Sequence, residues 1–140
     1  DSVYETAYII VVDIHLDIPY LDDEPQLEFV GFKKAIQTIG KRAKVGALVV
    51  IESTVPPGTC EKIVLPTLRA ELEERGLSQN CLHVAHSYER VMPGDDYLTS
   101  ITDFWRVFAG CDEAAGDSCE EFLSNVVNVK EYPLTRLQST

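Results

Sequence analysis

Short, largely apolar runs recur along this chain, at 7–12, 47–51, 81–85 and 104–110, and the first two are rich in β-branched residues. A run of this length without polar alternation is typical of a strand that is buried on both faces. Between the runs lie segments that we expect to be helical, at 26–43, 61–75 and 112–124. Strands that alternate with helices indicate right-handed crossover connections. We therefore predict an α/β fold, a Rossmann-like parallel sheet flanked by helices, with a last short strand at 126–129.

The size and charge of the chain limit its class of function. With 140 residues, 45% of them hydrophobic, it is long enough to bury the core of one domain. The net charge of −11 and the pI of about 4.6 argue against a nucleic-acid surface, which needs clustered Lys and Arg. No apolar run approaches the roughly 20 residues of a membrane helix, and no secretory signal opens the sequence. We expect a cytoplasmic protein that binds neither membranes nor nucleic acids.

The four cysteines are Cys60, Cys81, Cys111 and Cys119, and no two of them form a Cys-x-x-Cys pair. Only three histidines are available to complete a metal site, so we predict no metal site. Without a secretory signal, free and partly buried thiols are expected. A catalytic thiol needs an activating neighbour, and the sequence places no obvious one beside these cysteines.

Three polar segments directly follow predicted strands, at 13–17, 53–59 and 87–94. The carboxyl ends of parallel strands meet at one edge of a sheet, and open α/β folds bind their ligands there. We therefore expect the three segments to converge on a single site.

The segment 53–59, Ser-Thr-Val-Pro-Pro-Gly-Thr, is the most informative of the three. Two hydroxyls leave the strand, two prolines stiffen its exit, and Gly58 permits a close backbone turn. Thr59 is placed to cap the helix that follows. On composition alone, the segment is either a strand-to-helix turn with hydroxyl caps or part of a binding site.

Glu89 and Arg90 place a carboxylate and a guanidinium side by side after another buried strand. They are either a surface pair that contributes little to stability or the charged mouth of a cleft. In a cleft, Glu89 would have a raised pKa and serve as an acid or a base. The two residues alone leave both interpretations open.

Together, these motifs resemble the NAD-binding domain of the UDP-glucose/GDP-mannose dehydrogenase family. That family has a Ser-Thr-x-Pro-x-Gly-Thr turn at a strand end, which residues 53–59 match. Its next strand ends in Pro-Glu-Arg-Val-x-Pro-Gly, matched by residues 89–94, and residues 106–110 match a later strand that ends in Gly. The resemblance covers nearly the whole chain and is strongest to bacterial UDP-N-acetyl-hexosamine dehydrogenases.

The resemblance implies an NAD-dependent enzyme that oxidises the C6 alcohol of a nucleotide sugar twice, to a carboxylate. By this resemblance Thr54 and Glu89 are catalytic: Thr54 lies beside the nicotinamide, and Glu89 positions the substrate or takes part in acid–base steps. The residues implied in binding NAD are Val12, Ser53, Thr54 and Glu89. The residues implied in binding the nucleotide sugar are Glu89 and Arg90. The family also implies a homodimer for the intact enzyme.

The chain departs from the family pattern at two strand ends. Many members have Val-Pro-Thr-Pro after the first of these strands, whereas this chain has Val12-Asp13-Ile14-His15. The missing threonine is a usual contact on the nicotinamide side. Either Asp13, which we add as a cofactor-binding candidate, and His15 replace it, or the loop serves a variant substrate. Tyr88 stands where the family has Pro before the glutamate, which leaves the direction of Glu89 open.

No Gly-x-Gly-x-x-Gly occurs in the chain, although the family uses one to hold the pyrophosphate at a helix N-terminus. None of the cysteines stands in the sequence context of the family nucleophile. We therefore expect residues 1–140 to be the C-terminal part of the NAD-binding domain, an incomplete domain and a fragment of a longer enzyme. The phosphate-binding βαβ unit and the C-terminal domains would lie elsewhere in that enzyme, and the fragment alone would be inactive.

Two alternatives come from other classes of function. In a receiver-like signalling module, Asp13, Thr54 and Lys130 would stand for the phosphoacceptor, the hydroxyl and the lysine, but their spacing exceeds that of a compact receiver. A non-catalytic interaction domain derived from the same fold is the second alternative.

Overall fold

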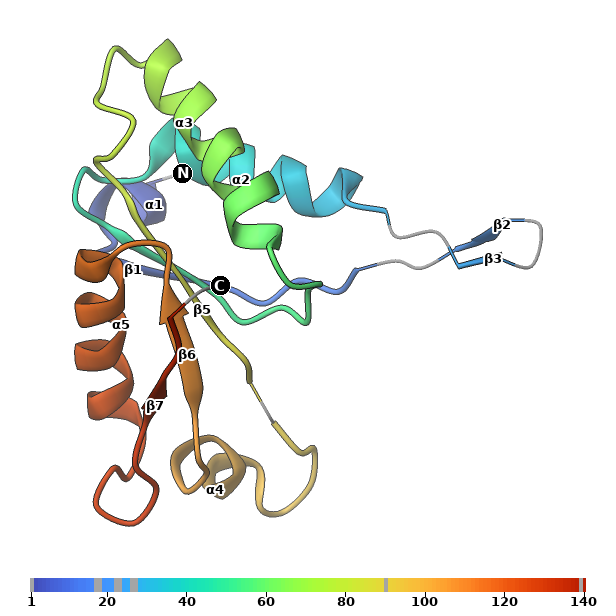
Figure 1. Cartoon of the computed structure of the whole chain (residues 1–140), viewed down its shortest axis with the longest axis vertical. Helices are drawn as coiled ribbons and strands as arrows, with labels where there is room; N and C mark the ends of the chain where they lie inside the picture. The colour runs from blue at the N-terminus through green and yellow to red at the C-terminus, as the bar shows by residue number, and fades with distance from the viewer. Residues whose placement is uncertain (1, 17–18, 22–23, 26–27, 90, 139) are drawn as a thin grey trace.

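A mixed five-stranded sheet organises the computed structural model of this chain (Figure 1). The structure describes residues 2–16, 19–21, 24–25, 28–89, 91–138 and 140. In spatial order the strands are β1 (Ile9–Val12), β4 (Leu48–Ile51), β5 (His83–Ser87), β6 (Val107–Gly110) and β7 (Thr135–Arg136). A separate antiparallel pair, β2 (Tyr20–Leu21) and β3 (Glu24–Pro25), projects away from this sheet (Figure 1).

Helices cover both faces of the sheet, with α2 and α3 packed together on one face and α5 on the other (Figure 1). The helical segments are α1 (Ser2–Thr6), α2 (Val30–Arg42), the π-helical turn η1 (Cys60–Val64), α3 (Leu65–Glu74), α4 (Tyr97–Thr102) and α5 (Glu113–Val126). The predicted α/β, Rossmann-like fold with flanking helices is therefore confirmed. No helix in the described part of the chain has the length and apolar character to cross a bilayer.

Strand β4 explains why an unbroken apolar run predicts a central strand. All four of its residues are buried, and both of its neighbours run parallel to it. Successive side chains on a strand point to opposite faces. Val49 and Ile51 belong to the core beneath α2 and α3, whereas Leu48 and Val50 belong to the core beneath α5. Because neither face meets water, the strand needs no polar residue.

Two details of the predicted sheet are wrong. Strand β6 runs antiparallel to β5, because Ser87 at the end of β5 pairs with Phe108 near the start of β6. The connection through α4 stays near the carboxyl end of β5 and does not cross a face of the sheet (Figure 1). The chain therefore re-enters the sheet at the end where β5 left it, and β6 runs in the opposite direction.

The last strand is also misplaced in the prediction for 126–129. Helix α5 continues to Val126, and the buried Val127 donates its N–H to the carbonyl of Leu123, which extends the helical bonding through this segment. Val127 is therefore buried at the end of the helix, whereas Val129 lies in a turn and is exposed. The last strand of the sheet is β7, which pairs parallel with β6.

Candidate functional site

The carboxyl ends of the three parallel strands lie side by side. Val12 of β1 is paired with Ile51 of β4, and Ile51 is paired with His86 of β5. The segments that follow these strands therefore leave the sheet at one edge, as the sequence predicts. We call this the strand-end edge, and its charged members are Asp13, Glu52, Glu89 and Arg106.

Ser53 ties two of the strand exits together. Its side chain is 1% exposed. Its hydroxyl oxygen accepts a hydrogen bond from the backbone N–H of Ile14 at 2.7 Å and donates to the carbonyl of Val12 at 3.3 Å. The backbone N–H groups of Glu52 and Ser53 also donate to the Val12 carbonyl, at 2.8 and 3.1 Å. Of the predicted cofactor-binding residues, Val12 and Ser53 are therefore in direct contact.

The rest of the turn presents Thr54 to solvent. Thr54 is exposed, next to the buried Ser53. Gly58 has a φ of +81°, a conformation that a side chain would strain, so the glycine allows the sharp turn into η1. Thr59 does not cap the helix as predicted, because its hydroxyl donates to the carbonyl of Pro56 at 2.7 Å and closes the turn on itself.

Arg106 is the only buried cation at the strand-end edge among the described residues. Its side chain is 3% exposed, and its Nη1 lies 3.6 Å from Oε1 of Glu52 and donates to the carbonyl of Tyr88 at 3.0 Å. Burial raises the pKa of the Glu52 carboxyl, Arg106 opposes this, and the charges of Glu89 and Asp13 add to the rise. Arg106 is therefore paired with Glu52, and the carboxylates of Glu89 and Asp13 lie near enough to influence the same group.

Glu89 folds back onto its own segment. Its Oε2 accepts a hydrogen bond from the backbone N–H of Val91 at 2.7 Å, and the side chain is partly buried. The preceding residue is held by Arg106, so a side-chain contact fixes the backbone where the family uses a proline. Asp13 is exposed after β1 on the same edge. Arg90, the predicted substrate residue, lies outside the described residues.

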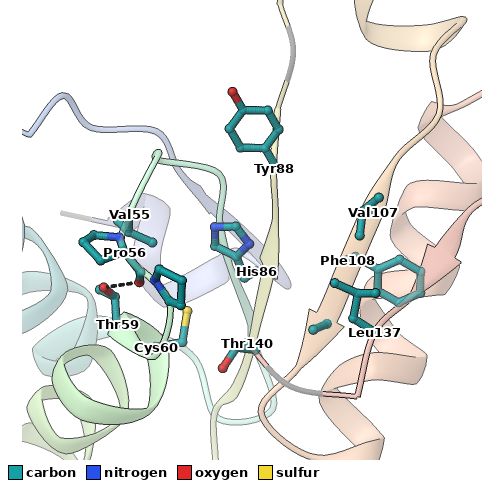
Figure 2. Close-up of a pocket in the computed structure, with 12 residues that line it drawn as sticks. Val55, Pro56, Thr59, Cys60, His86, Tyr88, Val107, Phe108, Leu137 and Thr140 are labelled. Atoms are coloured by element: carbon teal, nitrogen blue, oxygen red, sulfur yellow. Dashed lines mark hydrogen bonds between the residues drawn. The ribbon is translucent and has the colours of Figure 1, made fainter.

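A cavity of about 310 Å³ lies against the turn. Figure 2 shows His86 between the turn residue Pro56 and the β6 residues Val107 and Phe108. Nε2 of His86 is buried without a hydrogen-bond partner, and burial lowers the pKa of this imidazole. Thr54 and Glu89 do not line the cavity, but each is adjacent in sequence to a residue that does, Val55 and Tyr88.

The residues present fit one end of an NAD molecule. The oxidised nicotinamide ring is cationic, and Asp13, Glu52 and Glu89 give the strand-end edge an excess of negative charge over Arg106. The same charge opposes a pyrophosphate, and the chain contains no Gly-x-Gly-x-x-Gly turn to bind one. The strand-end edge therefore suits the nicotinamide end of the cofactor. The described residues contain no group of three His, Cys, Asp or Glu side chains suited to a metal ion.

Sequence reasoning did not identify Glu52, Arg106 or His86 as parts of this region. A usable indication existed for Arg106, a single cation in the apolar run 104–110, because a buried guanidinium needs a carboxylate partner. Glu52 directly follows a buried strand and is the matching candidate. Nothing in the local sequence indicates that His86 faces a cavity.

Comparison with known proteins identifies the family of this chain. The model of the UDP-glucose/GDP-mannose dehydrogenase family, NAD binding domain, matches residues 6–126. A UDP-N-acetyl-D-mannosamine dehydrogenase of Pyrococcus horikoshii is 36% identical over 117 residues, which are 81% of this chain and 26% of that protein. An NDP-N-acetyl-D-galactosaminuronic acid dehydrogenase of Ralstonia nicotianae is 33% identical over 120 residues, 79% of this chain and 27% of that protein.

A solved structure is similar over almost the whole chain. The crystal structure of NDP-N-acetyl-D-galactosaminuronic acid dehydrogenase from Methanosarcina mazei Go1 has a TM-score of 0.80 and 29% identity, over 98% of this chain and 28% of that chain. This chain therefore spans about a quarter of the length of the relatives that it matches. The predicted resemblance is confirmed, and the chain belongs to the UDP-glucose/GDP-mannose dehydrogenase family, in the part described as its NAD binding domain.

Proposed function

We propose that this chain forms the C-terminal part of the NAD-binding domain in a nucleotide-sugar 6-dehydrogenase. The longer enzyme oxidises the C6 alcohol of a UDP- or GDP-sugar to the carboxylate of a uronic acid. NAD⁺, when bound, accepts the hydride in each of the two oxidation steps. The observation that supports this proposal most is the meeting of the Thr54 and Glu89 segments at one sheet edge, in a chain of this family.

Thr54 and Glu89 are the proposed catalytic residues. The exposed hydroxyl of Thr54 follows a serine that is fixed by two strands, so it can hold the substrate oxygen or a water beside the nicotinamide. Glu89 is partly buried at the same edge as Asp13 and Glu52, and a carboxyl group in this position can serve as an acid–base group. Glu89 together with Arg90 would bind the sugar.

The remaining predicted residues are proposed to contact the cofactor. Val12, Asp13 and Ser53 line the exits of β1 and β4, next to Thr54. Ser53 would act through its backbone and its fixed position, because its hydroxyl is engaged with Val12 and Ile14. Asp13 would face the cationic ring and replace the threonine of other family members.

The proposal also covers the substrate, the location and the oligomeric state of the longer enzyme. Relatives named for UDP-N-acetyl-D-mannosamine and UDP-N-acetyl-D-glucosamine support a nucleotide-sugar substrate. A cytoplasmic homodimer that serves polysaccharide biosynthesis fits a family that acts on activated sugars. A non-catalytic interaction domain is the competing proposal, whereas family membership leaves the receiver-like module without support.

The test compares the 140-residue chain with a longer polypeptide that contains it. Each is incubated with NAD⁺ and, in turn, UDP-N-acetylmannosamine, UDP-glucose and GDP-mannose, and NADH formation is followed by absorbance. We expect the longer polypeptide to reduce NAD⁺ with one of these sugars, and the 140-residue chain to bind NAD⁺ weakly without turnover. Turnover by the shorter chain would contradict the proposal that these residues form only a part of the NAD-binding domain. NAD⁺ binding without turnover of any sugar by the longer polypeptide would favour the interaction domain.

A further inference from the structure

Two cysteines from distant parts of the sequence are in contact. Cys60 is the first residue of η1 and is 2% exposed, whereas Cys111 directly follows β6 and is partly exposed. Cys111 packs against the core that contains Cys60, and the two thiols lie close enough for a hydrogen-bonding interaction that shifts their pKa values in opposite directions. The backbone N–H of Cys111 donates to the carbonyl of Val84 in β5 at 2.8 Å, so the sheet fixes this position.

Thr140 strengthens the connection between the two cysteine segments. Its carbonyl accepts a hydrogen bond from the backbone N–H of Gly58 at 3.2 Å, two residues before Cys60. Its Oγ1 lies 3.7 Å from Sγ of Cys111. Cys60 and Thr140 both line the cavity beside the turn (Figure 2). The two thiols are therefore held together by contacts on both sides.

The two thiols differ in access and in acidity. Cys111 lines a surface hollow together with Asp112 and Arg136, so a small reagent can reach it. The hydrogen bond with Cys60 lowers the pKa of the Cys111 thiol, and the Thr140 hydroxyl adds to this effect against burial. The same hydrogen bond and burial raise the pKa of Cys60. Because Cys111 is reached from this hollow and Cys60 is buried, Cys111 reacts first and Cys60 second.

We propose that Cys60 and Cys111 form a dithiol modification site, which a small-molecule disulfide such as glutathione disulfide oxidises to an intramolecular disulfide. The Cys111 thiolate attacks one sulfur of glutathione disulfide, which forms a mixed disulfide and releases one glutathione. The Cys60 sulfur then attacks the Cys111 sulfur of that mixed disulfide and releases the second glutathione. The two protein thiols are oxidised, and their protons leave with the two glutathione molecules.

The other two cysteines of the chain differ from this pair in burial or in position. Cys119 is a completely buried residue of α5, and burial raises the pKa of its thiol to about 12. Cys81 is partly exposed like Cys111, but it precedes β5 at the opposite end of that strand from the turn. A Cys60–Cys111 disulfide would tie the start of η1, and with it the turn 53–59, to the end of β6.

The experiment treats the folded 140-residue chain with glutathione disulfide and measures intact mass and disulfide-linked peptides over time. We expect a species lighter by two hydrogen atoms, with Cys60 linked to Cys111, to form about tenfold faster than any other linkage. Cys60→Ala should stop at the glutathione adduct on Cys111, and Cys111→Ala should leave Cys60 unmodified. Cys81→Ala is the matched control and should keep the linkage. Circular dichroism checks that each variant is folded.

Three results would overturn the proposal. The first is a wild-type chain that retains all four free thiols under these conditions. The second is a linkage that includes Cys81 or Cys119. The third is a Cys81→Ala variant without the linkage, which remains decisive even where Cys60→Ala does not fold. Because the readout is mass, each result is independent of the enzymatic activity proposed above.

Discussion

Arg106 of the segment before β6 donates a hydrogen bond of 3.0 Å to the backbone carbonyl of Tyr88. Tyr88 directly precedes the proposed acid–base residue Glu89, at a position where the family has a proline. A proline restricts the backbone through its ring, and here a buried guanidinium holds the same peptide unit from outside. The direction of Glu89 therefore depends on a residue that is distant in sequence.

Replacing Arg106 with Met should lower the free energy of unfolding by about 3 kcal/mol, the scale for breaking a buried ion pair from one side. The substitution leaves Glu52 partly buried without its cation and the Tyr88 carbonyl without its donor. Urea denaturation followed by circular dichroism measures the change. Asp117→Asn, which breaks an exposed pair with Arg136, is the control and should cost less than about 1 kcal/mol. Equal costs for both variants would contradict the assigned role of Arg106.

The same variant has a predicted pH dependence. The folded-state pKa of Glu52 is raised, so its contribution to stability is present below the ordinary value of 4.5 and is lost as the pH rises through the raised value. Without Arg106 that pKa rises further. The difference in stability between wild type and Arg106→Met should therefore be smaller in acid than at neutral pH, and a constant difference would exclude Glu52 as the cause.

Ser53 and Thr54 are adjacent but should respond differently to alanine. Ser53→Ala removes the acceptor of the Ile14 N–H, so unfolding should become easier by about 1–3 kcal/mol. Thr54 is exposed, and Thr54→Ala should change stability by less than about 0.5 kcal/mol. Thermal denaturation of both variants tests this. A Thr54→Ala variant as unstable as Ser53→Ala would assign a structural role to Thr54.

His86 should make the fold sensitive to mild acid. Burial lowers the pKa of its imidazole below 6.5, so the stability that neutral His86 contributes is present above 6.5 and is lost as the pH falls through the lowered value. His86→Gln should flatten this part of the stability profile measured by urea denaturation. Thr38→Ala, at an exposed helix position without a titrating group, should keep the wild-type slope.

Gly110 is required by close packing at the end of β6. A Cβ there would lie 2.5 Å from the carbonyl oxygen of Asp112 and 2.7 Å from Cα of Gly116, and backbone cannot move away cheaply. We expect Gly110→Ala to destabilise the fold by about 3 kcal/mol or more, the scale of severe overpacking. Gly31→Ala in α2 has open space around it and should stabilise by up to about 1 kcal/mol. Similar effects at both glycines in chemical denaturation would disagree with this packing.

The elements that could be predicted are those whose burial can be inferred from their own residues. The run 47–51 has no polar member because both faces of β4 are buried, so its central place in the sheet follows from composition. The motif 53–59 could be assigned to a strand end for the same reason. The direction of β6 could not be predicted, because it depends on the route that residues 88–106 take and not on the strand itself.

Contacts between distant segments could not be predicted either. The sequence indicates that Arg106 needs a carboxylate partner, but its contact with Glu52, like that of Cys60 with Cys111, depends on how β5 and β6 pair. A single sequence contains each partner but no statement that they pair. The same holds for His86, whose position at a cavity depends on the turn and on β6.

The most direct test of the proposed function is the rate of NADH formation by the longer polypeptide carrying Thr54→Ala or Glu89→Gln. Both residues stand on the strand-end edge, so each substitution should lower kcat by about ten- to a thousandfold, the scale for a positioned or acid–base group. Thr38→Ala and Glu74→Gln, at exposed helix positions, are the matched controls and should retain wild-type rates. Rates near wild type for both Thr54→Ala and Glu89→Gln would contradict the assignment of catalytic residues to the strand-end edge.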